Sequence, residues 1–278
     1  MLIRPQIYYF GRLNLATAYS DKRQLINSAL NSDQSLDSKG YRWRFFDIAT
    51  IEHTSGEYFT GYLAKYKLTT EEETADEEHR TIFLEEASKR IAAKSRFFLH
   101  TNSGLISYHQ VRHKIMRDQF NSNFCHLFEI AHDHFFVHAE IQSIDEQYEI
   151  LEIMRKFDAI SKVSIYLHPS NPHSGIWKET DQRLKQRGIS SYKEEYSAKQ
   201  GGSLNVVDDE DFNSKVNMAV DGYGEASILG THEGQEKMVH TGQNPVTAKS
   251  PHKDTEYPEV FKDLQKAWEN IFNRFRQL

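Results

Sequence analysis

The stretch from residue 135 to residue 167 constrains the fold most, because its apolar pattern changes period twice within a short length. Residues 135–141 carry apolar side chains at every second position, which predicts a strand. Residues 144–157 carry an apolar stripe at helical spacing, and residues 163–167 return to a strand pattern. A strand, a helix and a strand of this length predict a right-handed parallel crossover or half of a ferredoxin-like split unit. We therefore expect an α+β protein with a central mixed sheet.

Around this unit the sequence suggests three consecutive parts. We expect an N-terminal α+β region over residues 1–134, a strand–helix–strand–helix unit over 135–200, and a β meander with a terminal helix over 201–278. Within the first part, residues 41–67 predict a hairpin, because aromatic and β-branched runs flank the turn-forming HTSGE. Residues 76–94 predict a helix, because their apolar residues recur three and four positions apart.

The third part combines short strands with the strongest periodic pattern in the chain. The segments VNMAV, EASIL and KMVHT, within residues 216–241, predict an antiparallel meander. A long terminal helix is expected after Pro258, with apolar residues alternately three and four positions apart: Phe261, Leu264, Trp268, Ile271 and Phe275. This stripe lies along the helix's own domain or forms the seam of a homodimer, and the sequence leaves both open.

Composition excludes several classes of protein. Among 278 residues there is one cysteine, Cys125, so neither a disulfide framework nor a multi-cysteine zinc site can form within the chain. No apolar run approaches the length that spans a bilayer, and the first residues do not read as a secretory signal, so we expect a cytoplasmic protein without membrane insertion. The phosphate-binding motifs GxxxxGK[ST] and GxGxxG and the nucleophile elbow GxSxG do not occur. No cofactor is predicted.

Charge is distributed unevenly along a chain of net charge −6. Residues 71–86 are strongly acidic, whereas residues 87–134 carry an excess of cations among aromatic side chains. Cations neutralise phosphates and aromatic rings stack on bases, so this region predicts a nucleic-acid-binding patch, for DNA or RNA. Its members are Lys89, Arg90, Lys94, Arg96, Tyr108, Arg112, Lys114 and Arg117, with Arg42 and Arg44 in a second cluster.

Histidines offer a weaker chemical signal. His132, His134, His138 and Glu140 all occupy even positions and would share one face of a strand. Three imidazoles spread along a strand are too far apart for one ion, so only His132 and His134 could chelate a metal, with a third ligand from elsewhere. A polar outer strand face explains the same pattern without any metal.

A resemblance to a known family rests on residues 168–226. The motifs that carry it are HPSNP at 168–172, Trp177 with Leu184 and Gly188, EEY at 194–196, GGSL at 201–204 and MAVDGYGEA at 218–226. With them the chain resembles an uncharacterised bacterial family, a domain of unknown function associated with mobile elements and phage-defence loci. More distantly, the order of its elements is similar to that of the A protein of the lambdoid Rex exclusion system and the B component of the Kiwa defence system. This resemblance implies DNA binding without strong sequence preference and a role in phage sensing.

We therefore expect a non-enzymatic sensor or effector of phage defence that binds nucleic acid, forms a homodimer and acts with a protein partner of a defence system. The first alternative is an enzyme, a metal-dependent nuclease or hydrolase built on His132 and His134. The second is an interaction or inhibitor subunit, in which the terminal helix and the acidic last third dock a partner.

Overall fold

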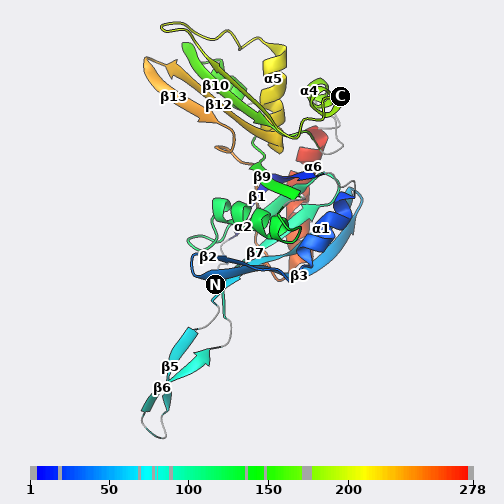
Figure 1. Cartoon of the computed structure of the whole chain (residues 1–278), viewed down its shortest axis with the longest axis vertical. Coiled ribbons are helices and arrows are strands. Elements are labelled where there is room, and N and C mark those ends of the chain that lie inside the picture. The colour runs from blue at the N-terminus through cyan, green and yellow to red at the C-terminus, as the bar shows by residue number, and fades with distance from the viewer. Residues whose placement is uncertain are drawn as a thin grey trace.

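The structure is a computed structural model with two lobes, each built on its own antiparallel sheet (Figure 1). It describes residues 5–17, 21–67, 70–76, 79, 81–87, 90–134, 137–146, 149–170 and 177–274. Among these residues, no helix is long and apolar enough to cross a membrane.

The first lobe contains an eight-stranded sheet in the order β14-β1-β8-β7-β4-β3-β2, and β9 also pairs with β1. Its strands are β1 (Gln6–Thr17), β2 (Leu36–Ser38), β3 (Tyr41–His53), β4 (Gly56–Tyr66), β7 (Ile91–His100), β8 (Leu105–His109), β9 (Val137–Ser143) and β14 (Thr247–Ser250). Its helices are α1 (Lys22–Leu30), α2 (Arg117–Ile130) and α6 (Tyr257–Arg274). The predicted hairpin over residues 41–67 is confirmed as β3 and β4.

The second lobe contains a four-stranded sheet in the order β11-β10-β12-β13. Its strands are β10 (Ala159–Leu167), β11 (Tyr192–Ser197), β12 (Gly224–His232) and β13 (Gln235–His240). Its helical segments are α3 (Glu149–Met154), α4 (Lys178–Gln186), α5 (Glu210–Met218) and a short π-helical turn, η1 (Ala219–Tyr223). The α+β class and the antiparallel C-terminal strands β12 and β13 are confirmed, and the sheets combine strands from all three expected parts of the chain.

The parallel crossover expected between residues 135 and 167 is wrong, and all described strand pairs are antiparallel, so the central sheet is not mixed. β9 pairs with β1 in the first lobe, whereas β10 lies in the second. The reason is that their apolar faces enter different cores: Val137 packs in the core under α2, and Val163 packs in the core of the second lobe.

The helix expected over residues 76–94 is also wrong. β5 (Thr70–Asp76) and β6 (Thr81–Ala87) form a hairpin that projects from the first lobe (Figure 1), and β7 follows. Three adjacent apolar residues, Ile82 to Leu84, fit a strand as well as a helix, and pairing with β5 decides between them.

The strand predicted over VNMAV is instead the end of α5 and the start of η1. Asp209 caps α5 by accepting a hydrogen bond from the backbone N–H of Phe212 at 3.0 Å. Phe212 and Val216, four positions apart, are both buried in the core of the second lobe. A capping residue followed by this spacing stabilises a helix.

The apolar stripe of α6 packs against its own lobe. Phe261, Leu264, Trp268 and Ile271 are at most 4% exposed, and they contact the face of the sheet that carries Tyr8 and Phe10. Trp268 meets Phe10 edge to face at 5.4 Å between ring centroids. The homodimer seam expected at these residues is therefore occupied within one chain, and Phe275 lies outside the described residues.

Candidate nucleic-acid interface

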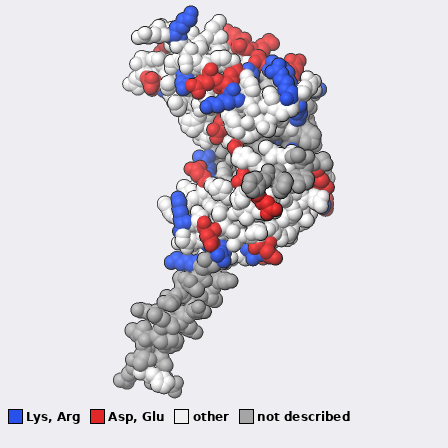
Figure 2. Space-filling model, viewed as in Figure 1, with Lys and Arg blue, Asp and Glu red and all other residues white. Residues whose placement is uncertain are grey.

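The structure separates the predicted cations into those that have carboxylate partners and those that do not. Arg42 makes a two-bond ion pair with Asp37 at 2.7 and 2.8 Å, and Arg44 pairs with Asp33. On the face that Figure 2 displays, Lys and Arg lie among Asp and Glu. Such pairs are already neutralised, so they contribute little to the attraction of a polyanion.

Three further members of the predicted patch are engaged inside the protein. Arg96 is 4% exposed, lies 3.6 Å from the ring centroid of Tyr62 and donates from Nε to the backbone carbonyl of Asp254. Lys94 lies over the same ring and 3.7 Å from the carboxylate of Asp254. Tyr108 is buried and stacks on Phe120 with 4.1 Å between centroids. The two cations and the tyrosine ring therefore make contacts within the protein.

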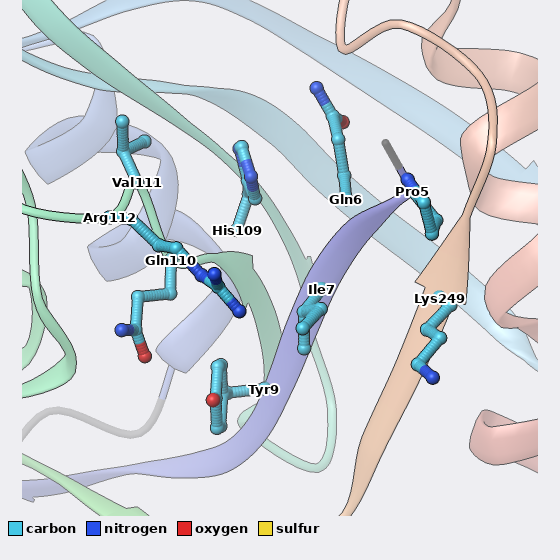
Figure 3. Close-up of a pocket in the computed structure, with 9 residues that line it drawn as sticks. All are labelled: Pro5, Gln6, Ile7, Tyr9, His109, Gln110, Val111, Arg112 and Lys249. Carbon is cyan, nitrogen blue, oxygen red and sulfur yellow. The ribbon is translucent and has the colours of Figure 1, made fainter. Parts of the chain in front are cut away.

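The other members take different positions. Arg90 is exposed just before β7, and Lys89 lies outside the described residues. Arg112, Lys114 and Arg117 have no carboxylate partner among the described residues. Arg112 lines an open pocket of about 540 Å³ at the edge of the first sheet (Figure 3).

We call this the β1–β8–β14 pocket, after the strands that build it. Antiparallel pairing places Lys249 of β14 opposite Ile7 of β1, and Tyr9 opposite Tyr108 of β8. The turn after β8 is closed by backbone hydrogen bonds between Val111 and Ile115, and it carries Arg112 to the rim. The lining residues are Pro5, Gln6, Ile7, Tyr9, His109, Gln110, Val111, Arg112 and Lys249.

Arg117 extends the cationic character of this pocket. It is the first residue of α2, and its guanidinium carbon lies 5.2 Å from the ring centroid of Tyr9. Tyr9 is half-buried and lines the pocket together with Arg112 and Lys249, and no described lining residue is acidic. Arg117 does not line the pocket but contacts it through the Tyr9 ring.

His109 adds a neutral polar group to the pocket. Burial lowers the pKa of its imidazole, an effect partly opposed by the negative charge of Asp254, so the ring is uncharged at neutral pH. Its Nδ1 atom is buried without a hydrogen-bond partner among the described residues. The His109 ring itself packs against that of Tyr8, with 5.5 Å between the centroids.

The predicted histidine cluster is divided between two places. His132 makes a 3.0 Å hydrogen bond from Nε2 to the Leu25 carbonyl, and His134 lies in the turn after α2 with φ of 57°. The described residues contain no group of three or more His, Cys, Asp or Glu side chains that could hold a metal ion. No geometry there supports a metal-dependent nuclease.

His138 and Glu140 do come together, with a partner that the sequence did not suggest. Glu140 lies 3.0 Å from His138 and 2.9 Å from His168, which follows β10 in the second lobe. These two imidazoles, with His168 first, lower the pKa of Glu140 to about 2 against the effect of burial. The cluster is a hydrogen-bonded contact between the lobes, and no sequence spacing could indicate residues 28 positions apart.

Comparison with known proteins places the chain in a family. A family model described as "Domain of unknown function (DUF4747)" matches residues 6–264. The chain belongs to the DUF4747 family. None of the curated proteins matches it.

Two members of the DUF4747 pocket were missed by sequence reasoning. Tyr9 lies on β1, far from Arg117 in the sequence, and only the fold brings the two side chains together. Lys249 follows a stretch rich in turn formers and lies more than 130 residues from Arg112. No local pattern distinguishes Lys249 from any other exposed lysine, so only the fold reveals its position.

Proposed function

We propose that this DUF4747 protein binds a nucleic-acid strand at the β1–β8–β14 pocket, without strong sequence preference. The observation that carries the proposal is that Arg112 and Lys249 line one pocket with Tyr9, without a carboxylate among the described lining residues, and that Arg117 lies 5.2 Å from the Tyr9 ring centroid. Cations of this kind neutralise backbone phosphates, and a half-buried tyrosine offers a face on which a base can stack.

The overall negative charge of the chain is compatible with this proposal. Exposed charges act over about 10 Å at 0.1 M salt, so a local cluster attracts phosphates despite distant acidic residues. A single strand suits the pocket better than a duplex, because its bases are free to reach an aromatic ring. The contacts that we assign are to phosphates and to a ring face, which are present whatever the sequence.

The proposal is tested by fluorescence anisotropy with random-sequence single-stranded DNA, single-stranded RNA and duplex DNA over a salt series. For the natural protein, we expect log K to fall linearly with log salt, with a slope of about −0.7 for each phosphate neutralised in a single strand. The pocket variant Arg112→Glu/Lys249→Glu should lose at least about tenfold in affinity and have a shallower slope.

The matched control is Arg42→Glu/Arg44→Glu, which changes the net charge equally at the two arginines already paired with Asp37 and Asp33. We expect it to retain affinity within about twofold, because screening weakens charges remote from the bound strand. Equal losses in both variants, or no binding at about 50 mM salt, would contradict the proposal.

We further propose a cytoplasmic role in phage exclusion, together with a protein partner of a defence system, which rests on the resemblance to the Rex and Kiwa components. Plaque counts on cells expressing the natural chain or the pocket variant test this role. If strand binding mediates exclusion, plaque numbers should fall with the natural chain and recover with Arg112→Glu/Lys249→Glu. Equal protection by both proteins would show that phage exclusion does not require the pocket.

A further inference from the structure

A second polar pocket, of about 350 Å³, lies where the two lobes meet. The first lobe contributes the end of β1 and Lys22 at the start of α1. The second lobe contributes the segment from His168 to Ser170 after β10, and Lys185 with residues 188–190 at the end of α4. None of the described residues that line this junction pocket is acidic.

Lys22 has an unusual position in this pocket. It is half-buried, and no ion pair or hydrogen bond links its ammonium group to a described residue. Burial lowers the pKa of Lys22, and the nearby positive charge of Lys185 lowers it further. Lys185 is paired with Asp181, whereas Lys22 has no described carboxylate partner, so an anion in the pocket would chiefly neutralise Lys22.

Lys185 is held in place by a network beneath the pocket. Its Nζ atom donates to Asp181 Oδ2 at 2.6 Å and to Ser170 Oγ at 2.9 Å. The backbone N–H of Ser170 donates to the other oxygen of Asp181 at 2.6 Å, and Asp181 is 4% exposed. An ammonium has three donors, so one N–H of Lys185 remains for a ligand on the pocket side.

His168 forms a fixed wall of the same pocket. Its Nε2 atom lies 2.9 Å from Glu140 of the first lobe, and its Nδ1 atom lies 3.4 Å from the backbone carbonyl of Ser190. Both ring nitrogens therefore have partners in the protein. Lys185 is therefore held by Asp181 and Ser170, His168 is held by Glu140 of the other lobe, and Lys22 lines the same pocket. Preorganised donors bind an anion at a smaller entropic cost than mobile ones.

We propose that the junction pocket binds the phosphate group of a small molecule, with the Lys22 and Lys185 ammonium groups as the donors. Its volume falls within the range of small-molecule sites, and it accommodates a free phosphate or a mononucleotide. Because its walls belong to both lobes, the bound anion joins them. This site is separate from the β1–β8–β14 pocket and does not depend on the function proposed there.

Isothermal titration calorimetry and thermal unfolding test the proposal on the full chain, at constant ionic strength. The probes are inorganic phosphate, pyrophosphate and AMP. We expect saturable binding to the natural protein and a rise in melting temperature with probe concentration, because a ligand that binds only the folded state stabilises it. Tighter binding of AMP than of phosphate identifies a nucleotide as the ligand class, whereas equal affinities identify the phosphate group alone.

The decisive variant is Lys22→Gln, with Lys178→Gln as the matched control. Lys22 has no described partner to lose, so its variant should fold and should bind about tenfold more weakly or worse, as expected for one lost charge-assisted hydrogen bond. Lys178 is exposed on the same helix as Lys185 but does not line the pocket, so its variant should bind like the natural protein.

Two results would overturn the proposal: no binding of any probe to the natural protein, or unchanged affinity in Lys22→Gln. Strand binding by Lys22→Gln provides a check on folding, and it should equal that of the natural protein. Conversely, Arg112→Glu/Lys249→Glu should bind the phosphate probes normally, so a failure of either proposal is distinguishable from a failure of the other.

Discussion

Among the arginines that lie over tyrosine rings, Arg12 and Arg117 have opposite surroundings. At the junction of the lobes, the guanidinium carbon of Arg12 lies 4.1 Å from the ring centroid of Tyr223. At the edge of the first sheet, that of Arg117 lies 5.2 Å from the centroid of Tyr9. Both are cation–π contacts, but Arg12 is 0% exposed whereas Arg117 is half-buried beside an open pocket.

The difference comes from what surrounds each guanidinium. Arg12 donates from Nε to the carbonyl of Asp221 at 2.9 Å, and Trp177 donates to the Asp221 carboxylate at 2.8 Å. Burial raises the pKa of Asp221, against the effects of Trp177 and Arg12. Arg117 donates one 3.3 Å hydrogen bond to the carbonyl of Gly242. The same pair of residue types joins two lobes where the guanidinium is enclosed, whereas the guanidinium of Arg117 stays partly exposed.

The largest expected effect is the loss of stability in Arg12→Met. Removing one member of a buried polar network leaves its partners unsatisfied, which costs about 3–5 kcal/mol. Urea denaturation should therefore show a much lower free energy of unfolding. The matched variant Arg117→Met should lose less than about 1 kcal/mol, because its surroundings are solvated. Equal losses in the two variants would remove the distinction between the two contacts.

A smaller effect should come from Asp145, which also lies at the junction. Its backbone carbonyl accepts a hydrogen bond from Arg274 at 2.7 Å, and its Oδ2 atom accepts one from the Gly242 N–H at 2.6 Å. Burial raises the pKa of this carboxyl from 3.8 to about 6, an increase that the Gly242 hydrogen bond opposes. The folded state therefore holds the proton more tightly than the unfolded state does.

The sign follows directly from this shift. As pH rises from about 4 to 6, the folded protein must ionise a buried carboxyl, so this group reduces stability by up to about 3 kcal/mol and the loss persists above pH 6. Asp145→Asn should lack this contribution. The measurement is the difference in unfolding free energy between the natural protein and the variant at pH 4, 5, 6 and 7. A difference that is constant with pH would show that Asp145 does not titrate in this range.

The smallest effect should come from Tyr9→Leu, and it should appear in binding rather than in folding. Loss of the stacking face should weaken single-strand binding by about tenfold. The slope of log K against log salt should stay unchanged, because a neutral tyrosine neutralises no phosphate. Anisotropy measures both quantities. An altered slope with unchanged affinity would assign Tyr9 a role in positioning Arg117 instead of one in stacking.

The sequence predicted part of the candidate site because local charge density is visible in it. Arg112 and Arg117 belong to the segment with an excess of cations, yet nothing local distinguished them from Arg42 or Arg96. Arg42 has a carboxylate partner five positions away across a hairpin, and Arg96 is covered by Tyr62 and Asp254. Whether a cation is free depends on contacts between strands, which composition does not encode.

By itself, the sequence determined the α+β class, the hairpin of β3 and β4, and the apolar face of α6, since these follow from side-chain periodicity and turn chemistry over neighbouring residues. Only the tertiary structure decided that β9 and β10 belong to different sheets and that α6 covers its own lobe. It also placed Lys249 and Tyr9 in the lining of one pocket, and Lys22 and Lys185 in the lining of another. The physical reason is that the sequence of a segment shows which of its side chains must be buried or paired. The segment against which they pack depends on the whole folded chain.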